Sequence, residues 1–271
     1  FLLRCIALVL VILVLARPQT TNKWQNSEIE GIDIMLAIDV STSMLAEDLK
    51  PNRLEAAKDV AAEFINGRPN DNIGITLFAG ETFTQCPLTV DHAVLLDMIH
   101  NIKCGLITDG TAVGMGIANA VTRLKDSKAK SKVIILLTDG TNNKGDISPM
   151  TAAEIAKSFG IRVYTIGVGT NGMAPYPYPV GNTVQYVSMP VEIDEKTLTE
   201  IAGTTDGNYF RATSNSKLKE VYEEIDKLEK TKLNVKEYSK RDEEYHWFAL
   251  AAFLCVLLEV LLRNSVLKKI P

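Results

Sequence analysis

The stretch "LAIDVSTSML", residues 36–45, joins an apolar run to small oxygen-bearing side chains. The apolar run starts a few residues upstream, and its composition predicts a buried strand over residues 32–39. Asp39, Ser41 and Ser43 then follow at alternating positions. Carboxylate and hydroxyl oxygens are the kind of ligand that a hard divalent cation such as Mg²⁺ takes. The stretch therefore indicates a candidate cation site at the end of the first strand of a sheet.

Strand and helix patterns alternate from residue 30 to about residue 230. Further strands are predicted at residues 72–80, 83–89, 132–140, 161–169 and 208–213. The spacing of apolar residues predicts helices at residues 52–67, 90–102, 110–127, 148–160, 194–207 and 214–230. This alternation is typical of an α/β fold with a doubly wound, mostly parallel sheet flanked by helices. Pro87 cannot donate to a neighbouring strand, so we expect its strand at an edge of the sheet.

One segment interrupts this alternation. Residues 169–194 are rich in proline and glycine. They predict a surface hairpin, with "TVQYVSM", residues 183–189, as one arm.

Further polar residues follow other predicted elements. The strand "KVIILLTDG" ends in Thr138 and Asp139, and Thr111 begins the helix of "TDGTAVG". Ligands of open α/β sheets bind beyond the carboxyl ends of the strands, so these side chains are expected to converge with those of the opening stretch. The competing interpretation is local: the serines and Thr111 would cap helices, and Asp139 would begin a turn.

The combined pattern resembles a known family. Asp-x-Ser-x-Ser, a later loop threonine and an aspartate after an apolar strand are similar to the metal-ion-dependent adhesion site (MIDAS) of von Willebrand factor A (VWA) domains. The resemblance covers about residues 28–230. The five motif positions correspond to Asp39, Ser41, Ser43, Thr111 and Asp139. The family implies bound Mg²⁺ or Mn²⁺ and a protein partner that supplies an acidic side chain to the cation.

The flanks narrow the resemblance. "ARPQ" after an apolar N-terminal segment, the blocks "DVSTSM" and "DGTAVG", and an apolar C-terminal segment resemble BatA-type bacterial membrane proteins. That family is named for aerotolerance in Bacteroides. Membership implies related Bat proteins and a MoxR-type AAA+ ATPase as partners, in a complex linked to aerotolerance or envelope stress.

Both ends of the chain are apolar. "FLLRCIALVLVILVLA" begins without methionine and predicts a truncated transmembrane helix, although a secretory signal core is the alternative. "YHWFALAAFLCVLLEVLLRNSVLKKIP" combines aromatic residues, an apolar run and a basic end, which favours a second span over a buried amphipathic helix. Lysines beyond this span place its end in the cytoplasm, and the central domain outside the inner membrane of a bacterium. A cytoplasmic ATPase would then reach only a loop or the tail.

The predicted organisation has five parts. They are a transmembrane helix at residues 1–17, a VWA domain at 28–230, a juxtamembrane linker at 231–245, a transmembrane helix at 246–263 and a cytoplasmic tail at 264–271. The chain would also contact membrane lipid. An extracytoplasmic domain permits a disulfide between Cys86 and Cys104, but two buried free thiols are the favoured interpretation.

Other features of the sequence argue against nucleic-acid binding, a zinc site and a phosphate-binding loop. The net charge is −4 and no basic block is present, so nucleic-acid binding is not expected. The three histidines lack partners at the spacing of a zinc site, and "GVGTNG" does not match a phosphate-binding loop. Asp48, Asp109 and Asp146 could line the rim of the site, but solvated loop acids are the favoured interpretation.

Three functions compete at this point. The leading hypothesis is a membrane-anchored module that binds protein partners through its cation, without catalysis. The alternative is a Mg²⁺-dependent hydrolase or phosphatase that uses Asp39 as nucleophile, but such enzymes carry a second carboxylate where this chain has Ser41. The third hypothesis is a spacer domain with a degenerate site, and the complete set of five motif residues argues against it.

Overall fold

A computed structural model describes residues 8–9, 12, 14–15, 19–20, 31–170, 172–180, 183–236, 242–243 and 245–265. The chain forms two compact units. The larger comprises Glu28–Lys232, and the smaller comprises Phe1–Ser27 together with Leu233–Pro271.

A six-stranded sheet is the centre of the larger unit. Its strand order is β4–β3–β2–β5–β6–β9, and only β4 runs antiparallel to its neighbour. The strands are β2 (Asp33–Asp39), β3 (Asn72–Phe78), β4 (Thr82–Thr89), β5 (Lys132–Thr138), β6 (Ile161–Val168) and β9 (Tyr209–Ala212). The predicted, mostly parallel sheet is confirmed, and the strand with Pro87 lies at an edge as expected.

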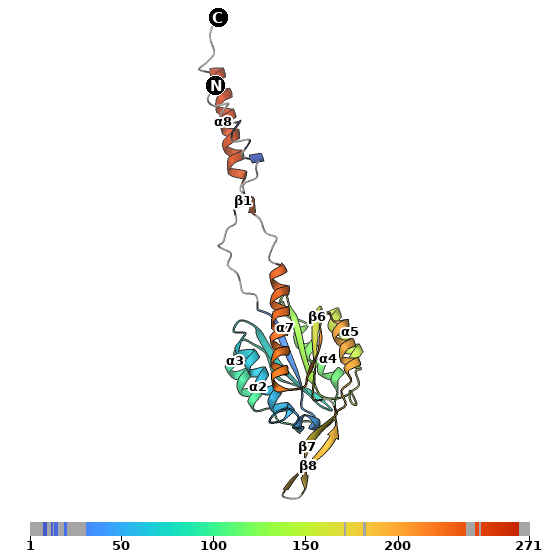
Figure 1. Cartoon of the computed structure of the whole chain (residues 1–271). Coiled ribbons are helices and arrows are strands. Elements are labelled where there is room, and N and C mark those ends of the chain that lie inside the picture. Colours follow the sequence, from blue (N-terminus) through green and yellow to red (C-terminus); the bar gives the residue numbers. More distant parts are fainter. Residues whose placement is uncertain are drawn as a thin grey trace. The chain divides into compact units, whose positions relative to one another are not determined.

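Helices cover both faces of the sheet (Figure 1). Helices α4, α5 and α6 pack together on one face, and α2, α3 and α7 lie on the other. Their bounds are α2 (Arg53–Asn66), α3 (His92–His100), α4 (Val113–Leu124), α5 (Pro149–Ser158), α6 (Glu195–Thr204) and α7 (Asn215–Lys236). This arrangement confirms the doubly wound α/β fold.

The central strands are buried along their length. All seven residues of β2 are buried, as are six of the seven in β5. Helices on both faces explain why these strands are continuously apolar instead of alternating. Burying each of Ile34, Leu36 and Ile38, which are at most 1% exposed, contributes roughly 1.5–3 kcal/mol. The packed strands provide a rigid base for the polar residues at their carboxyl ends.

A hairpin follows β6. Strands β7 (Met173–Val180) and β8 (Thr183–Pro190) pair antiparallel, which confirms the hairpin predicted within residues 169–194. It projects from the end of the unit where β6 finishes (Figure 1).

Within the described residues of the smaller unit, the assigned elements are two short strands and one helix, and residues 8–9, 12 and 14–15 are also helical. Strands β1 (Gln19–Thr20) and β10 (Asp242–Glu243) pair antiparallel, and α8 spans Tyr245–Ser265. The second predicted span falls within α8, whereas most of the first span and of the predicted tail lies outside the described residues. No helix within the described ranges is long and apolar enough to cross a membrane, so the two predicted spans are not confirmed.

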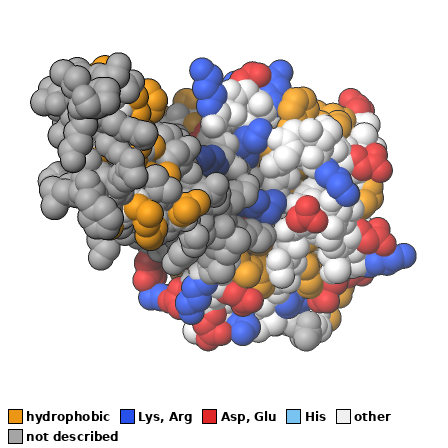
Figure 2. Space-filling model, turned by 90° about the horizontal axis from the view of Figure 1, so that it is seen from above, with side chains coloured by type: hydrophobic (Ala, Val, Ile, Leu, Met, Phe, Trp, Pro, Cys, Tyr) orange, Lys and Arg blue, Asp and Glu red, His pale blue; other side chains and the backbone are white. Residues whose placement is uncertain are grey.

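The surface of the larger unit carries both signs of charge. On the face visible in Figure 2, Lys and Arg side chains are interspersed with Asp and Glu side chains. Neither sign forms a separate patch on the coloured part of this face.

Candidate metal centre

Two neighbouring strands bring the first polar groups together. Strands β2 and β5 are parallel, with Ile38 in register with Leu137, so Asp39 and Thr138 emerge side by side. The Thr138 hydroxyl donates to Asp39 Oδ2 at 2.6 Å. The shared carboxyl edge of the sheet thus places the aspartate of the opening stretch against the end of β5.

Asp39 is fully buried. Its other oxygen, Oδ1, accepts a hydrogen bond from the backbone N–H of Ser41 at 2.9 Å. Burial, followed by the nearby charge of Asp139, raises the pKa of Asp39 to about 7. A proton or a divalent cation would each offset the negative charge that is buried here.

Ser41, Ser43 and Asp139 form a continuous set of contacts. The two serine hydroxyls lie 3.0 Å apart, and Ser43 Oγ donates to Asp139 Oδ1 at 2.8 Å. Ser41 precedes the 3₁₀ helix η1 (Thr42–Leu45), but its side chain makes no capping hydrogen bond. The local interpretation of the serines as helix caps is therefore wrong for Ser41. Ser43 is exposed, so the cluster opens to solvent on this side.

Thr111 lies beside the same turn. It is buried, and its Oγ1 atom is 3.4 Å from the position that a Cβ would take on Gly140. Its backbone N–H donates to Asn143 Oδ1 at 2.9 Å, and helix α4 begins two residues later. All five predicted residues thus lie around the carboxyl ends of β2 and β5.

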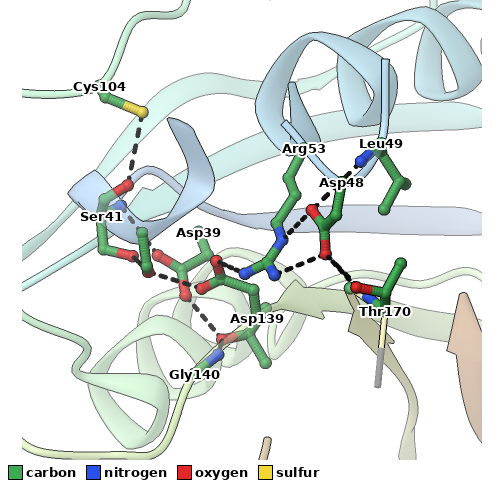
Figure 3. A network of polar contacts seen from close by, with 12 residues as sticks. Asp39, Ser41, Asp48, Leu49, Arg53, Cys104, Asp139, Gly140 and Thr170 are labelled. Atoms are coloured by element: carbon green, nitrogen blue, oxygen red, sulfur yellow. Dashed lines mark hydrogen bonds and ion pairs between the residues drawn. The ribbon is translucent and has the colours of Figure 1, made fainter. Parts of the chain in front are cut away.

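Arg53 joins the cluster from the first position of α2 (Figure 3). Its Nη1 atom donates to Asp139 Oδ2 at 2.6 Å, and its Nε and Nη2 atoms each donate to Asp48 at 2.7 Å. The side chains of Asp48 and Arg53 are 3% and 4% exposed. The expectation that Asp48 is a solvated loop acid is therefore wrong, because a buried guanidinium holds it inside.

The rim carries two further groups. Asp109 is exposed, as expected, and accepts hydrogen bonds from the backbone and hydroxyl of Thr42 at 3.0 and 2.8 Å. Cys104 donates its thiol proton to the carbonyl of Ser41 at 3.4 Å. Burial, then the charges of Asp39 and Asp139, raises the pKa of Cys104 to about 12. Cys104 is half-buried and free, and Cys86 is buried and free, so the prediction of two buried thiols holds fully only for Cys86.

The residues suit a hard divalent cation. The ionised carboxylates of Asp39, Asp48 and Asp139 carry three negative charges, and the guanidinium of Arg53 offsets one of them. Two negative charges remain in excess. No group of three or more His, Cys, Asp or Glu side chains within the described ranges could hold a metal. Ligation at this place therefore depends on the hydroxyls, which Mg²⁺ and Mn²⁺ accept.

Arg53 is not predicted from the sequence, whereas Thr138 is expected at this edge because it ends a strand. A signal for Arg53 exists, since a cation at the first turn of a helix opposes the helix dipole. Such a placement indicates that the charge is needed for another contact.

The hairpin extends the surroundings of the cluster. A cavity of about 250 Å³ lies between them, and its walls include Ser43, Arg53, Tyr176, Tyr178 and Met189. Polar residues of the site and apolar residues of β7 and β8 therefore share one opening.

A family model for the von Willebrand factor type A domain matches residues 33–224. The chain belongs to this family. The VWA match includes all five cluster residues and the hairpin, so the fold expected from the sequence resemblance is confirmed.

Relatives point to a group of membrane proteins. An uncharacterized protein of Borreliella burgdorferi is 27% identical over 98% of this chain and 78% of its own length. BatB of Bacteroides thetaiotaomicron is 34% identical, with a TM-score of 0.65 over 74% of this chain and all of that structure. An aerotolerance-related membrane protein of Bacteroides fragilis is also 34% identical, with a TM-score of 0.63 over 73% of this chain and all of that structure. The expected Bat-type relationship is confirmed at the level of the family.

A more distant VWA structure contains a metal. Proximal thread matrix protein 1 of the mussel byssus is 25% identical, with a TM-score of 0.58 over 73% of this chain and 45% of that protein. That structure has zinc in its MIDAS motif.

Proposed function

We propose that this chain is a membrane-anchored VWA protein that binds Mg²⁺ or Mn²⁺ and captures a protein partner through the bound cation. The proposed ligands are Asp39, Ser41, Ser43, Thr111 and Asp139. The observation that carries the proposal is the buried excess of negative charge beside three hydroxyls. A divalent cation would neutralise this excess.

The exposed side of the cluster supports a role in binding. Five protein groups leave one position of an octahedral cation for an external ligand. Ser43 is exposed, so that position would open towards solvent. When bound, the cation would supply a coordination position for a carboxylate from a protein partner.

The partner class comes from the resemblance. Related Bat proteins and a MoxR-type AAA+ ATPase are the candidates, in a complex linked to aerotolerance or envelope stress. The names of the Bacteroides structures support the Bat assignment.

Membrane anchoring is supported by α8. Its described side chains include many exposed apolar residues, such as Leu250, Phe253, Leu254, Leu258 and Leu261, each at least 50% exposed. We place α8 in the bacterial inner membrane and the VWA domain on the periplasmic side, because lysines follow the helix in the sequence. The segments 1–17, 231–245 and 264–271 retain the proposed roles of first span, linker and tail.

The geometry does not favour the hydrolase alternative. Asp39 is 0% exposed and both of its oxygens accept hydrogen bonds from the protein. Ser41 also stands where an aspartyl-nucleophile enzyme carries its acid/base carboxylate. We therefore propose a non-catalytic module.

Calorimetry of the full chain tests the proposal. Mg²⁺ is titrated into the wild type, Asp39→Asn and the matched control Asp59→Asn, in which an exposed aspartate of α2 is changed. The proposal requires binding by the wild type and the control, and loss of binding in Asp39→Asn. A short acidic peptide should then bind the wild type only with the cation present. Equal Mg²⁺ binding by all three proteins would disprove the site.

A further inference from the structure

The β7–β8 hairpin presents apolar side chains to solvent. Six of them are between 47% and 61% exposed: Met173, Tyr178, Val184, Tyr186, Val187 and Met189. Side chains alternate between the two faces of a hairpin, so three of these residues lie on each face. Exposed apolar side chains of this size are a feature of interaction sites. The backbone of the hairpin shows which edge is available.

The direction of the backbone groups follows from two hydrogen bonds. The carbonyl of Pro175 accepts from the N–H of Glu47 at 2.8 Å, so the backbone of Pro175 faces away from β8. Ser188 lies opposite Pro175, and opposite residues of an antiparallel pair share their orientation, so Ser188 faces away from β7. Val191 N–H donates to the carbonyl of Gly172 at 2.8 Å, so these two residues face each other. They lie an odd number of positions from Ser188 and Pro175, as the alternation of backbone direction requires.

The outer edge of β7 is closed. Pro175, Pro177 and Pro179 occupy alternate positions and therefore share the outward direction. A proline nitrogen carries no hydrogen, so this edge offers no N–H donor at these positions. A further strand cannot form a regular ladder on β7.

The outer edge of β8 is open. Val184, Tyr186 and Ser188 lie opposite the three prolines, so their N–H and C=O groups point away from the hairpin. All eight residues of β8 are exposed. Among the described residues, none forms a backbone hydrogen bond with these three. An uncharged edge with unpaired donors and acceptors is a template for another strand.

We propose that the outer edge of β8 pairs antiparallel with β8 of a second copy of this chain, so that two hairpins form one four-stranded sheet. Two identical strands are complementary when a two-fold axis relates them. In the register centred on Tyr186, Val184 lies opposite Ser188 of the second copy, and the two tyrosines lie opposite each other. Each tyrosine hydroxyl donates to Glu47 of its own chain at 3.0 Å, which fixes the side chain at this edge.

Two observations favour a second copy over a foreign strand. Edges that must not pair with themselves are usually protected by charge, and neither Met173–Val180 nor Thr183–Pro190 contains a charged residue. The prolines of β7 close the other edge, so that pairing stops at two copies instead of continuing into a fibre. This inference is independent of the metal site.

The test removes two outward-facing backbone N–H donors of β8 and keeps the hydrogen bonds within the hairpin. Val184→Pro with Ser188→Pro closes β8 in the same way that prolines close β7, without breaking the bonds between the two strands. Val184→Ala with Ser188→Ala is the matched control, because it shortens the side chains but keeps both N–H groups. Sedimentation of the full chain in detergent, over a wide range of concentration, measures the dimer. Thermal melting checks that each variant is folded.

We expect the wild type and the alanine variant to dimerise, and the dissociation constant of the proline variant to be higher by roughly tenfold or more. Hydrogen exchange of the wild type should show slower exchange of residues 183–190 as concentration rises. This second measurement decides the question if the proline variant misfolds. A wild type that stays monomeric overturns the proposal, whether or not foreign strands bind. Equal dimerisation of the proline variant, or equal loss in both variants, also overturns it.

Discussion

Arg53 donates from Nη1 to Asp139 Oδ2 at 2.6 Å, so a buried guanidinium is bound to a proposed metal ligand. The same guanidinium contacts Asp48, whose Oδ2 atom accepts from the backbone of Thr170 at 2.8 Å. Thr170 lies just before the hairpin. The guanidinium of Arg53 therefore connects the carboxylate cluster, through Asp48, to the base of the hairpin (Figure 3).

Arg53→Met should strongly destabilise the metal-free protein. It leaves two buried carboxylates without their counter-ion, and removing one partner of a buried ion pair costs about 3–5 kcal/mol. Mg²⁺ should stabilise this variant more than it stabilises the wild type, because the cation replaces the lost positive charge. Urea unfolding in Mg²⁺ and in chelator measures both effects.

Arg53→Lys is the matched control for charge. Lysine keeps the charge but cannot bind Asp48 and Asp139 with a planar fork, so we expect a smaller loss of stability. If Arg53→Met is as stable as the wild type in chelator, the ion pairs do not hold the cluster together.

Cation affinity should decrease as pH falls through 7. The pKa of Asp39 is raised to about 7, mainly by burial, so below this pH a cation must displace a proton. Displacement of one proton weakens the apparent affinity roughly tenfold per pH unit. Calorimetry at several pH values, in buffers of different ionisation enthalpy, counts the released proton. An affinity that is the same about one pH unit below and about one unit above the pKa of about 7 would contradict this assignment.

The raised pKa of Asp39 also affects stability in the absence of metal, and here a fall in pH is stabilising. The folded protein holds a proton on Asp39 more tightly than the unfolded chain, whose carboxyl has the usual pKa of 3.8. This contribution to the free energy of unfolding is therefore present below pH 3.8 and is lost as pH rises to about 7. Asp39→Asn should abolish this part of the pH dependence in chelator.

Ser43→Ala should weaken cation binding and lower stability modestly. The hydroxyl is a proposed ligand, and its loss should lower affinity by on the order of tenfold or more. The variant also loses the hydrogen bond to the buried Asp139, so the free energy of unfolding should fall by about 1–3 kcal/mol. Thr42→Ala is the control, because its hydroxyl binds Asp109 instead. Equal affinities in the two variants would remove Ser43 from the ligand set.

Glu229→Gln should destabilise the domain far from the metal centre. Glu229 is 1% exposed and accepts hydrogen bonds from Arg162, Tyr164 and Ser131. Burial alone would raise the pKa of Glu229, but these bonds, chiefly from Arg162, outweigh burial and hold it below its usual 4.5. The stabilisation is therefore present above pH 4.5 and is lost as pH falls through the lower, folded pKa.

We expect Glu229→Gln to lower the free energy of unfolding by about 3–5 kcal/mol near neutral pH. The difference from the wild type should shrink in acid. Glu223→Gln, an exposed change on the same helix, should have no effect. A loss of stability that is the same in acid and at neutral pH would mean that the charge of Glu229 is not the cause.

The fold could be predicted because the central strands are apolar through their middle, as in β2 and β5. Residues 32–39 and 132–140 lie between helical segments and can only be buried strands. Asp39 and Asp139 follow these strands, and the carboxyl ends of parallel strands lie at one edge of the sheet, so the two aspartates are expected to meet. The hairpin was predictable for a similar reason, since proline and glycine in residues 169–194 exclude a helix.

The remaining contacts could not be predicted, because they join residues far apart in the sequence. Arg53 and Asp139 are separated by 86 positions, and no local pattern links them. Asp48 looked like a loop acid since its burial depends on Arg53, which itself lies at an unfavourable helix position. Pairing of charges in three dimensions has no periodicity that a sequence displays.

Anomalous diffraction from a crystal grown with Mn²⁺ tests the central claim most directly. The account predicts one strong anomalous peak at the carboxyl ends of β2 and β5, surrounded by Asp39, Ser41, Ser43, Thr111 and Asp139. The peak should be absent from crystals of Asp39→Asn. A well-ordered wild-type crystal at saturating Mn²⁺ with no peak there, or with its peak at another place, would contradict the account.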